Sequence, residues 1–318
     1  YPDLHEYQLQ LCEEPQKLLE LLSSVQGLYF VDGEPLLLHK ALVHKDGSAT
    51  SLLLRIKQAM TQGQLIVAAD GGAARAMNAA GPVILSGDSH QALVHGGNEF
   101  KEGIFTCREQ NNCPANLVSN GLIYHNAGGI GLLEGVSIDS RFSERARQGR
   151  LARLLTDTSQ RLGLGLDERS GVLISGDGIA LQAQTLTALG ENSVSVFDAQ
   201  EIKADSSYKR GVRSMRFHLL TQDDTLFFRG KKLVVSFADW KYNSNKLTQP
   251  VIQSGNAFRS DNFRRIAKML CQTGAQNATL KHTVVGTGHS IFVQKSRSSV
   301  SLSGRLNING KNFAYCSF

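Results

Sequence analysis

QLIVAADGGAARAM, residues 64–77, is the stretch that decides the fold class. Its apolar start predicts a strand, its Asp-Gly-Gly segment predicts a tight turn, and its alanine-rich end predicts a helix. A strand that passes through one short turn into a helix is the repeating unit of sheets that carry helices on their faces. The stretch therefore predicts an α/β protein.

Strands and helices alternate on both sides of this stretch. Helix periodicity with a Ser/Thr start and a Gly stop predicts a helix over 48–63, and a short apolar run predicts a strand over 27–33. The other predicted elements are helices at 15–25 and 142–163, strands at 135–139, 171–175, 193–199, within 210–228 and at 231–238, and a long loop at 95–131. This alternation predicts a doubly wound, mostly parallel sheet.

The composition changes near residue 245, after which Ser, Asn, Thr and Gln dominate. A helix is predicted over 260–275, and the segments that follow it resemble strands. We therefore expect an α/β domain over residues 1–245 and an appended C-terminal unit, α+β or all β, over residues 246–318.

The overall composition excludes several classes of protein. The 318 residues are 41% hydrophobic and 19% charged, which is typical of a folded globular chain and not of a disordered one. No apolar run reaches the roughly 18 residues of a membrane helix, so no membrane span is predicted. The net charge of +6 is mild for this length, and the arginine-rich segment lacks interleaved aromatic residues, so no nucleic-acid partner is predicted.

Five cysteines, at positions 12, 107, 113, 271 and 316, lack both CxxC and zinc-site spacing. The candidate disulfides are Cys107 with Cys113, across a short loop, and Cys271 with Cys316, late in the chain. Five free thiols are the open alternative. The start at Tyr1 rather than Met favours a processed, exported (periplasmic or extracellular) protein over a cytoplasmic one. The histidines are scattered, so no metal and no cofactor are predicted.

The turn after residue 69 is where a hydrolase of this architecture places its nucleophile on a strained elbow. Small residues are needed around such a nucleophile, and Gly72, Ala73 and Ala74 meet that need. Position 71, however, is Gly71, which has no side chain to attack with. A phosphate-binding turn is the other interpretation, but the GxGxxG spacing is missing and Asp70 would repel phosphate.

Several ordered blocks resemble the cyanophycinase branch of the peptidase E family. VSIDSRFSERARQGRLARLL (136–155) and RLGLGLDERSGVLI (161–174) are similar to the family's DQHF-x-x-RGR-x-GRL and GIGIDE runs. YFVDGE (29–34), IVAADGGAARAM (66–77) and VILSGDS (83–89) are similar to its FFTGGDQ, VVAGTSAGAAVM and MIVEGES blocks. The resemblance covers roughly residues 27–235 and implies a serine-peptidase fold of the class I glutamine amidotransferase-like kind.

The resemblance also implies a chemistry, serine hydrolysis of Asp-containing peptides such as β-Asp-Arg dipeptides. The family's nucleophile falls on Gly71, its base on Arg141, its acid near Asp88, and a glutamine that lines its site on Pro35. Arginine stays protonated and cannot act as a general base. We therefore expect a catalytically degenerate member, a pseudoenzyme that acts as a binding or assembly component toward a protein partner or its own copies.

Four charged residues of the family's substrate pocket are kept, namely Asp139, Arg145, Arg147 and Arg150. Arginine pairs bidentately with carboxylates, so one interpretation is a surviving ligand cleft for an acidic or Asp/Arg peptide. In the other interpretation these arginines hold loops together through hydrogen bonds to carbonyl groups and acids. Both interpretations stay open at the level of the sequence.

An active serine-type peptidase or hydrolase with a rebuilt site is the alternative to a pseudoenzyme. GDSH (87–90) offers Ser89 beside His90, although adjacent side chains rarely point at each other. Chain length adds a further expectation. Family members have roughly two strand–helix units before the strand matched by 27–33, whereas 26 residues precede it here. We therefore expect the N-terminal strands of the parent fold to be missing from this chain or supplied separately.

Overall fold

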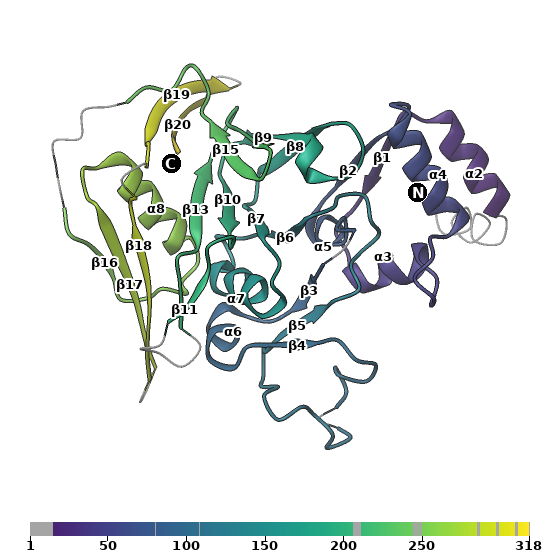
Figure 1. Ribbon diagram of the computed structural model, residues 1–318, viewed down its shortest axis with the longest axis horizontal. Coiled ribbons are helices and arrows are strands. Elements are labelled where there is room, and N and C mark those ends of the chain that lie inside the picture. The colour runs from purple at the N-terminus through teal and green to yellow at the C-terminus, as the bar shows by residue number, and fades with distance from the viewer. Residues whose placement is uncertain are drawn as a thin grey trace.

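The computed structural model of the chain describes residues 15–79, 81–107, 109–205, 211–243, 248, 250–284, 287–296, 299–308 and 311–317. Tyr1 and Cys12 lie outside the described residues. The helices α2 (Pro15–Ser24) and α4 (Ser51–Thr61) lie at one end of the molecule and two β-hairpins at the other, with the predicted α/β region between them (Figure 1).

The stretch 64–77 folds as predicted. β2 (Ile66–Ala69) passes into α5 (Gly71–Arg75) and pairs in parallel with β1 (Gly27–Phe30). The inner faces of both strands pack against α4 and α3 (Pro35–Leu42) in one hydrophobic core. The predicted helix at 48–63 begins after Thr50, whose hydroxyl accepts a hydrogen bond from the Leu53 N–H and so satisfies the first turn.

A small three-stranded sheet follows along the chain. It consists of β3 (Val83–Ser86), β5 (Leu122–His125) and β4 (Gly97–Glu99), with β3 antiparallel and β4 parallel to the central β5. α6 (Ser89–His95) connects β3 to β4. The loop predicted over 95–131 is therefore shorter in the structure, because the strands β4 and β5 lie within that range.

The central sheet has the order β13-β10-β7-β6. Its strands are β6 (Val136–Ser140), β7 (Leu162–Leu166), β10 (Val194–Asp198) and β13 (Arg216–Leu220). β6 and β7 are parallel, whereas β10 is antiparallel to both of its neighbours. β6 and β10 are buried along their whole length, which explains why they appear in the sequence as short apolar runs.

The helix expected over 142–163 is shorter in the structure. α7 runs from Gln148 to Thr158. Arg141 and Ala146 both have a φ of +47°, in the left-handed region that a right-handed helix does not contain. The chain therefore turns between residues 141 and 147 before α7 begins. This turn carries the residues expected in the site.

A second four-stranded sheet is entirely antiparallel, in the order β15-β14-β9-β8. Its strands are β8 (Ser170–Gly176), β9 (Gln184–Gly190), β14 (Thr225–Arg229) and β15 (Lys232–Ser236), with a 3₁₀ turn, η1 (Leu181–Ala183), between β8 and β9. The fold is therefore mixed α/β, as predicted. Parallel pairs occur at β1–β2, β4–β5, β6–β7 and β16 (Ile252–Ser254) with β17 (Asn277–Val284).

The described residues after 245 contain the predicted helix and strands. They form β16, α8 (Asn262–Gln272), β17, β18 (Thr287–Gln294), β19 (Leu302–Ile308) and β20 (Lys311–Ser317). Phe263, Ile266 and Leu270 of α8 share one core with Phe142 and Phe197. The division at residue 245 stays a prediction, although this segment packs directly on the α/β region.

Two disulfides and a buried polar group further fix the fold, and a hydrogen bond from Lys241 joins the C-terminal segment to the rest of the chain. Both candidate disulfides are present, Cys107–Cys113 and Cys271–Cys316, and the second ties α8 to β20. Lys241 and Asp224 form a fully buried ion pair at 2.6 Å, and the Lys241 ammonium also donates to the Ser317 hydroxyl. Among the described residues no helix is both long enough and apolar enough to cross a membrane.

Candidate functional site

The turn from β2 into α5 keeps the geometry of a nucleophile elbow. Gly71 is the first residue of α5 and has a φ of +53°. Glycine adopts this conformation at little cost, whereas a residue with a side chain is strained there. The backbone therefore presents position 71 as a catalytic elbow would, but without a side chain.

Asp32, just after β1, fills the space that a side chain at position 71 would need. A Cβ atom on Gly71 would overlap the carboxylate of Asp32. The Gly72 N–H donates to Asp32 Oδ1 at 2.6 Å, and Arg141 Nη2 lies 2.7 Å from Asp32 Oδ2. The hydrogen bond from Gly72, and after it the charge of Arg141, lowers the pKa of Asp32 against a partial desolvation that raises it. Asp32 is therefore an anion held by both groups.

Arg141 directly follows β6, at the position where the family's base is expected. Its guanidinium lies between Asp32 and Glu168, with a distance of 4.0 Å from Arg141 Nε to Glu168 Oε1. The side chain is 46% exposed. The structure thus brings Arg141 and Gly71 together through the carboxylate of Asp32, which no motif in the sequence had marked.

Asp88 is not the acid that lies beside Gly71 and Arg141. Its carboxylate accepts the Gln91 N–H at 2.7 Å and caps the start of α6, and its own N–H donates to the Asn120 carbonyl. The carboxylate that reaches Gly71 and Arg141 belongs to Asp32. Asp88 is therefore placed as a helix cap.

Ser89 and His90 are not arranged as a nucleophile and its base. The Ser89 hydroxyl is buried, accepts the N–H groups of Gly149 and Arg150, and donates to the Ala146 carbonyl. The His90 ring instead packs against His282, with ring centroids 4.9 Å apart. Ser89 thus ties α6 to the start of α7.

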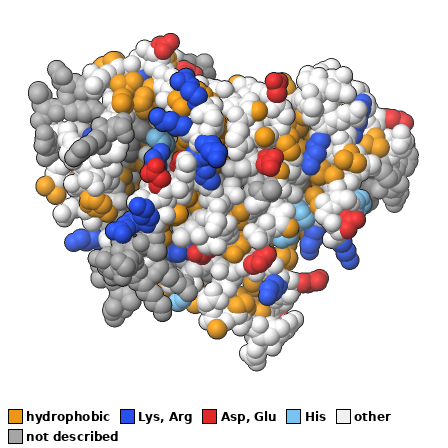
Figure 2. All heavy atoms as spheres, in the orientation of Figure 1, with side chains coloured by type: hydrophobic (Ala, Val, Ile, Leu, Met, Phe, Trp, Pro, Cys, Tyr) orange, Lys and Arg blue, Asp and Glu red, His pale blue; other side chains and the backbone are white. Residues whose placement is uncertain are grey.

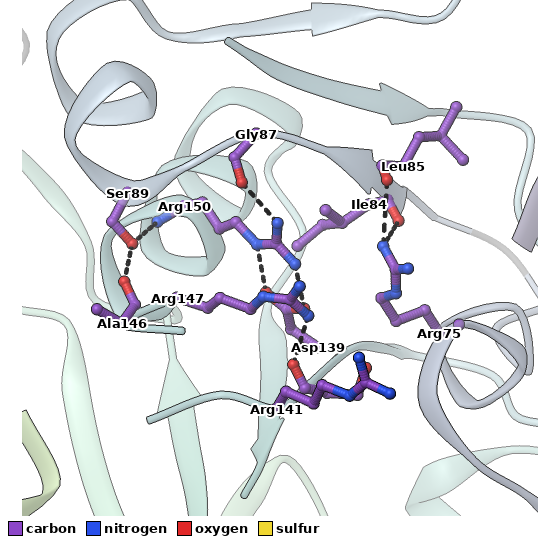
Figure 3. Close-up of polar contacts among 12 residues, drawn as sticks. Arg75, Ile84, Leu85, Gly87, Ser89, Asp139, Arg141, Ala146, Arg147 and Arg150 are labelled. Atoms are coloured by element: carbon purple, nitrogen blue, oxygen red, sulfur yellow. Dashed lines mark hydrogen bonds and ion pairs between the residues drawn. The ribbon is translucent and has the colours of Figure 1, made fainter. Parts of the chain in front are cut away.

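Asp139, on β6, is the hub of a buried arginine cluster (Figure 3). Its side chain is fully buried and binds Arg150 in a bidentate manner, with distances of 2.7 Å from Nε and 2.6 Å from Nη2. Arg150 also donates to the Gly87 carbonyl, and Arg147 donates to the Ser140 carbonyl at 2.6 Å. Arg147 Nη1 lies 3.4 Å from Asp139. Three of the four predicted ligand residues are thus brought together.

Arg145, the fourth predicted ligand residue, does not join this cluster. It is exposed in the turn before α7, and its N–H donates to the Arg141 carbonyl. Among the described contacts, no hydrogen bond or ion pair joins its side chain to Asp139. Burial is the main cause that lowers the pKa of Arg147, and the charge of Arg145 adds to it.

Arg75, on α5, is a member of the cluster that sequence reasoning missed. Its Nη1 donates to the Ile84 carbonyl at 2.7 Å, whereas its buried Nε has no hydrogen-bond partner among the described residues (Figure 3). Burial lowers the pKa of Arg75, and burial likewise lowers the pKa of Arg147 to about 10. One sequence signal could have revealed it, because IVAADGGAARAM has Arg where VVAGTSAGAAVM has Ala.

The cluster therefore holds more positive than negative charge. Arg147 and Arg150 contact the carboxylate of Asp139, and the charge of Arg75 interacts with it without a hydrogen bond. Arg150 uses its donors on Asp139 and Gly87, so it holds the structure together as one of the sequence interpretations expects. Arg147 is partly exposed. No group of three or more His, Cys, Asp or Glu side chains suited to a metal ion occurs in the described ranges.

Comparisons with known proteins support a relationship to cyanophycinases. No family model matches the chain. The chain is 24% identical over 217 residues to a cyanophycinase of Synechococcus elongatus, a match that covers 66% of this chain and 55% of the relative. It is 26% identical over 219 residues to cyanophycinases of Trichormus variabilis and of a Nostoc species, covering 67% of this chain and 60% of each relative. The chain thus spans little more than half the length of these relatives.

Proposed function

We propose that this protein is a non-catalytic relative of the cyanophycinases that acts as a binding or assembly component. The position of the Asp32 carboxylate carries the proposal, since it fills the space where the side chain of a nucleophile would stand. The Gly72 N–H is the donor that an enzyme of this design turns toward the developing oxyanion. Here that donor is bound to Asp32 at 2.6 Å.

The remaining groups do not rebuild acyl-transfer chemistry. Such chemistry needs a nucleophile, a base to activate it, and free donors for the oxyanion. Gly71 has no side chain, and Arg141 stays protonated. Asp32 is a weak base, because its pKa is lowered and its oxygens are bound to Gly72 and Arg141. This set of groups favours binding over turnover.

The ligand class that we propose is a peptide with Asp carboxylates, such as an Asp/Arg peptide. The surplus of buried arginine over Asp139 supports it. Burial, and after it the charge of neighbouring arginines, lowers the pKa of Arg147, and a ligand carboxylate beside this arginine would favour its charged form. Arg141, whose side chain is half exposed, offers further donors at the mouth of the same site.

We also propose an exported location and a more specific fold. Two disulfides favour an oxidising compartment. The parallel pairs β1–β2 and β6–β7 favour a doubly wound sheet of the cyanophycinase kind, to which these strands would belong. The partner in an assembly would be another protein or further copies of this chain.

Calorimetric titration with β-Asp-Arg dipeptide tests the binding proposal. We expect binding, weakened at least about tenfold in Arg147→Met, which removes the charge and keeps much of the side-chain length. Arg145→Met is the matched control, because it removes an exposed arginine two residues away and should bind as the wild type does. Absence of binding by the wild type would rule out the cleft, and labelling of any serine by a fluorophosphonate would rule out the pseudoenzyme.

An active hydrolase with a rebuilt site is the second candidate function. One observation favours it, namely that the carboxylate of Asp32 occupies the space beside Gly71 where the side chain of a nucleophile would begin. Carboxylates act as nucleophiles in other hydrolases, through a covalent intermediate that water then cleaves. Peptide turnover that is lost in Asp32→Asn would favour this candidate over the pseudoenzyme.

A further inference from the structure

A band of Lys and Arg side chains covers part of the surface, and it includes none of the residues around Gly71. Figure 2 shows Lys and Arg side chains gathered over the region of β15, β13 and β11 (Lys203–Asp205). The members of this basic band are Arg161, Lys203, Arg213, Arg216, Arg229, Lys231 and Lys232. All except the half-buried Arg161 are exposed. They come from four separate parts of the chain.

A chain of contacts makes the band continuous. Arg161 Nη1 donates to the Lys231 carbonyl at 2.9 Å, and Arg161 Nε lies 3.1 Å from Asp198. Asp198 stands opposite Arg216 in the pairing of β10 with β13. Arg216 in turn forms an ion pair with Glu201, two residues before Lys203. The hairpin β14–β15 and the pair of β11 with β12 (Gly211–Arg213) therefore belong to one surface.

Within this band like charges stand directly opposite each other. Arg229 is the cross-strand partner of Lys232 beside the turn at Gly230, and Lys203 is the cross-strand partner of Arg213. Like charges in such positions destabilise a sheet. Within the described part of the band, the buried Asp198 pairs with Arg161 and Glu201 pairs with Arg216. These like-charged pairs are therefore kept at a cost in stability, and acids among the described residues do not neutralise them. We take this as a sign of an acidic partner outside the chain.

Two other roles, protection of an edge strand and binding of single-stranded nucleic acid, do not explain most of the cations in the band. A single lysine on an edge strand is enough to discourage edge-to-edge association, whereas this band draws cations from five strands, β11 to β15, and from Arg161 and Lys231 beside them. Binding of single-stranded nucleic acid relies on exposed aromatic platforms. The aromatic ring of Phe228 is instead covered by the Arg161 guanidinium, 5.1 Å from its centroid.

We propose that the basic band is a docking surface for an acidic, extended segment of a partner protein. β15 ends its sheet, so one of its edges has no neighbouring strand in the described sheet order. An extended segment can pair with such an edge through its main chain. Its Asp and Glu side chains then meet Lys231, Lys232 and Arg229 at the hairpin. This proposal is independent of the pseudoenzyme assignment, because it involves none of Asp32, Gly71 or Arg141.

Fluorescence anisotropy with labelled poly-L-glutamate and the full chain tests this surface. We expect binding at about 50 mM salt that weakens steeply as salt rises. The double variant Lys231→Glu/Lys232→Glu should lose at least about tenfold in affinity. Lys40→Glu/Lys101→Glu changes the net charge equally at two exposed lysines outside the band and should bind as the wild type does.

Three results would overturn the proposal. The first is absence of poly-L-glutamate binding at low salt, and the second is an equal loss of affinity in both double variants, which would assign binding to net charge alone. The third is tighter binding of duplex DNA than of poly-L-glutamate, which would assign the band to nucleic acid. Circular dichroism of each variant separates a lost surface from a lost fold.

Discussion

Asp32 and Gly71 form a matched pair of residues. In the blocks that this chain resembles, a glycine precedes the GDQ run and a serine stands on the elbow. In this chain Asp32 stands at the position of that glycine, and Gly71 stands at the position of that serine. The overlap between a Cβ at Gly71 and the Asp32 carboxylate explains why the two changes belong together. Restoring the serine at position 71 without the glycine at position 32 would place two side chains in the same space.

Gly71→Ser is therefore expected to destabilise the protein strongly on its own. The added side chain overlaps Asp32 and strains a backbone with a φ of +53°, so the free energy of unfolding should fall by about 2 to 4 kcal/mol. In the double variant with Asp32→Gly the loss should be smaller than the sum of the two single losses by at least about 1 kcal/mol. Urea unfolding measures all four proteins.

Gly63→Ser is the matched control for this cycle. Gly63 has a φ of +69° and nothing within 4 Å of the added Cβ, so it reports backbone strain without overlap. We expect no coupling between Gly63→Ser and Asp32→Gly. Additive losses for Gly71→Ser and Asp32→Gly would show that Asp32 does not occupy the side-chain position.

The charge of Asp32 gives a prediction about pH. Its pKa is lowered in the folded protein by Gly72 and Arg141, whereas the unfolded chain has an ordinary aspartate near pH 3.9. The stabilisation is therefore fully present above about pH 4 and is lost as pH falls through the lowered pKa. It should not exceed about 1 kcal/mol, because the side chain is partly exposed.

Urea midpoints of the wild type and Asp32→Asn between about pH 6 and pH 2.5 measure this stabilisation. The wild-type advantage should be constant at the upper end and shrink as the pH falls toward the lower end. An advantage that grows as pH falls would mean that Asp32 is protonated in the folded state, contrary to the observed contacts.

At the scale of elements, α8 and β20 show how the C-terminal segment is held. Cys271 of α8 and Cys316 of β20 are buried together with Leu219 of β13, and the disulfide closes a loop with a sequence separation of 45. Cys107–Cys113 closes a loop with a separation of 6 between β4 and β5. The long loop restricts the unfolded chain more than the short one does.

Removing each disulfide by a pair of Cys→Ser changes should therefore cost different amounts. On the chain-entropy scale the loss is about 4 kcal/mol for Cys271–Cys316 and about 2 kcal/mol for Cys107–Cys113. Thermal unfolding under non-reducing conditions measures both, and reduction of the wild type, which opens both disulfides, should cost more than either pair of changes alone. Equal losses for the two pairs would indicate that α8 and β20 are not tied in the way the structure describes.

At the scale of the whole molecule, the sequence predicts the elements better than their pairing. The β2–α5 unit, α4 and the Cys107–Cys113 disulfide were predictable because their signals are local. The Cys271–Cys316 pair could be proposed because few other cysteines remain to pair. The direction of strand pairing was not predictable, since an apolar run such as β10 is compatible with a parallel or an antiparallel neighbour. β9 was missed because its polar Gln and Thr residues weaken the apolar signal. Asp32 was missed because its contact with Gly72 spans 40 residues of chain.

The hydrolysis of β-Asp-Arg dipeptide tests the central claim, that Asp32 closes the catalytic position, most directly. Free arginine is measured by mass spectrometry at several concentrations of the wild type and of Asp32→Asn. We predict no release above the protein-free rate for either protein, because Gly71 supplies no nucleophile and Asp32 is held by Gly72 and Arg141. Release that rises in proportion to wild-type protein and is lost in Asp32→Asn would contradict this claim.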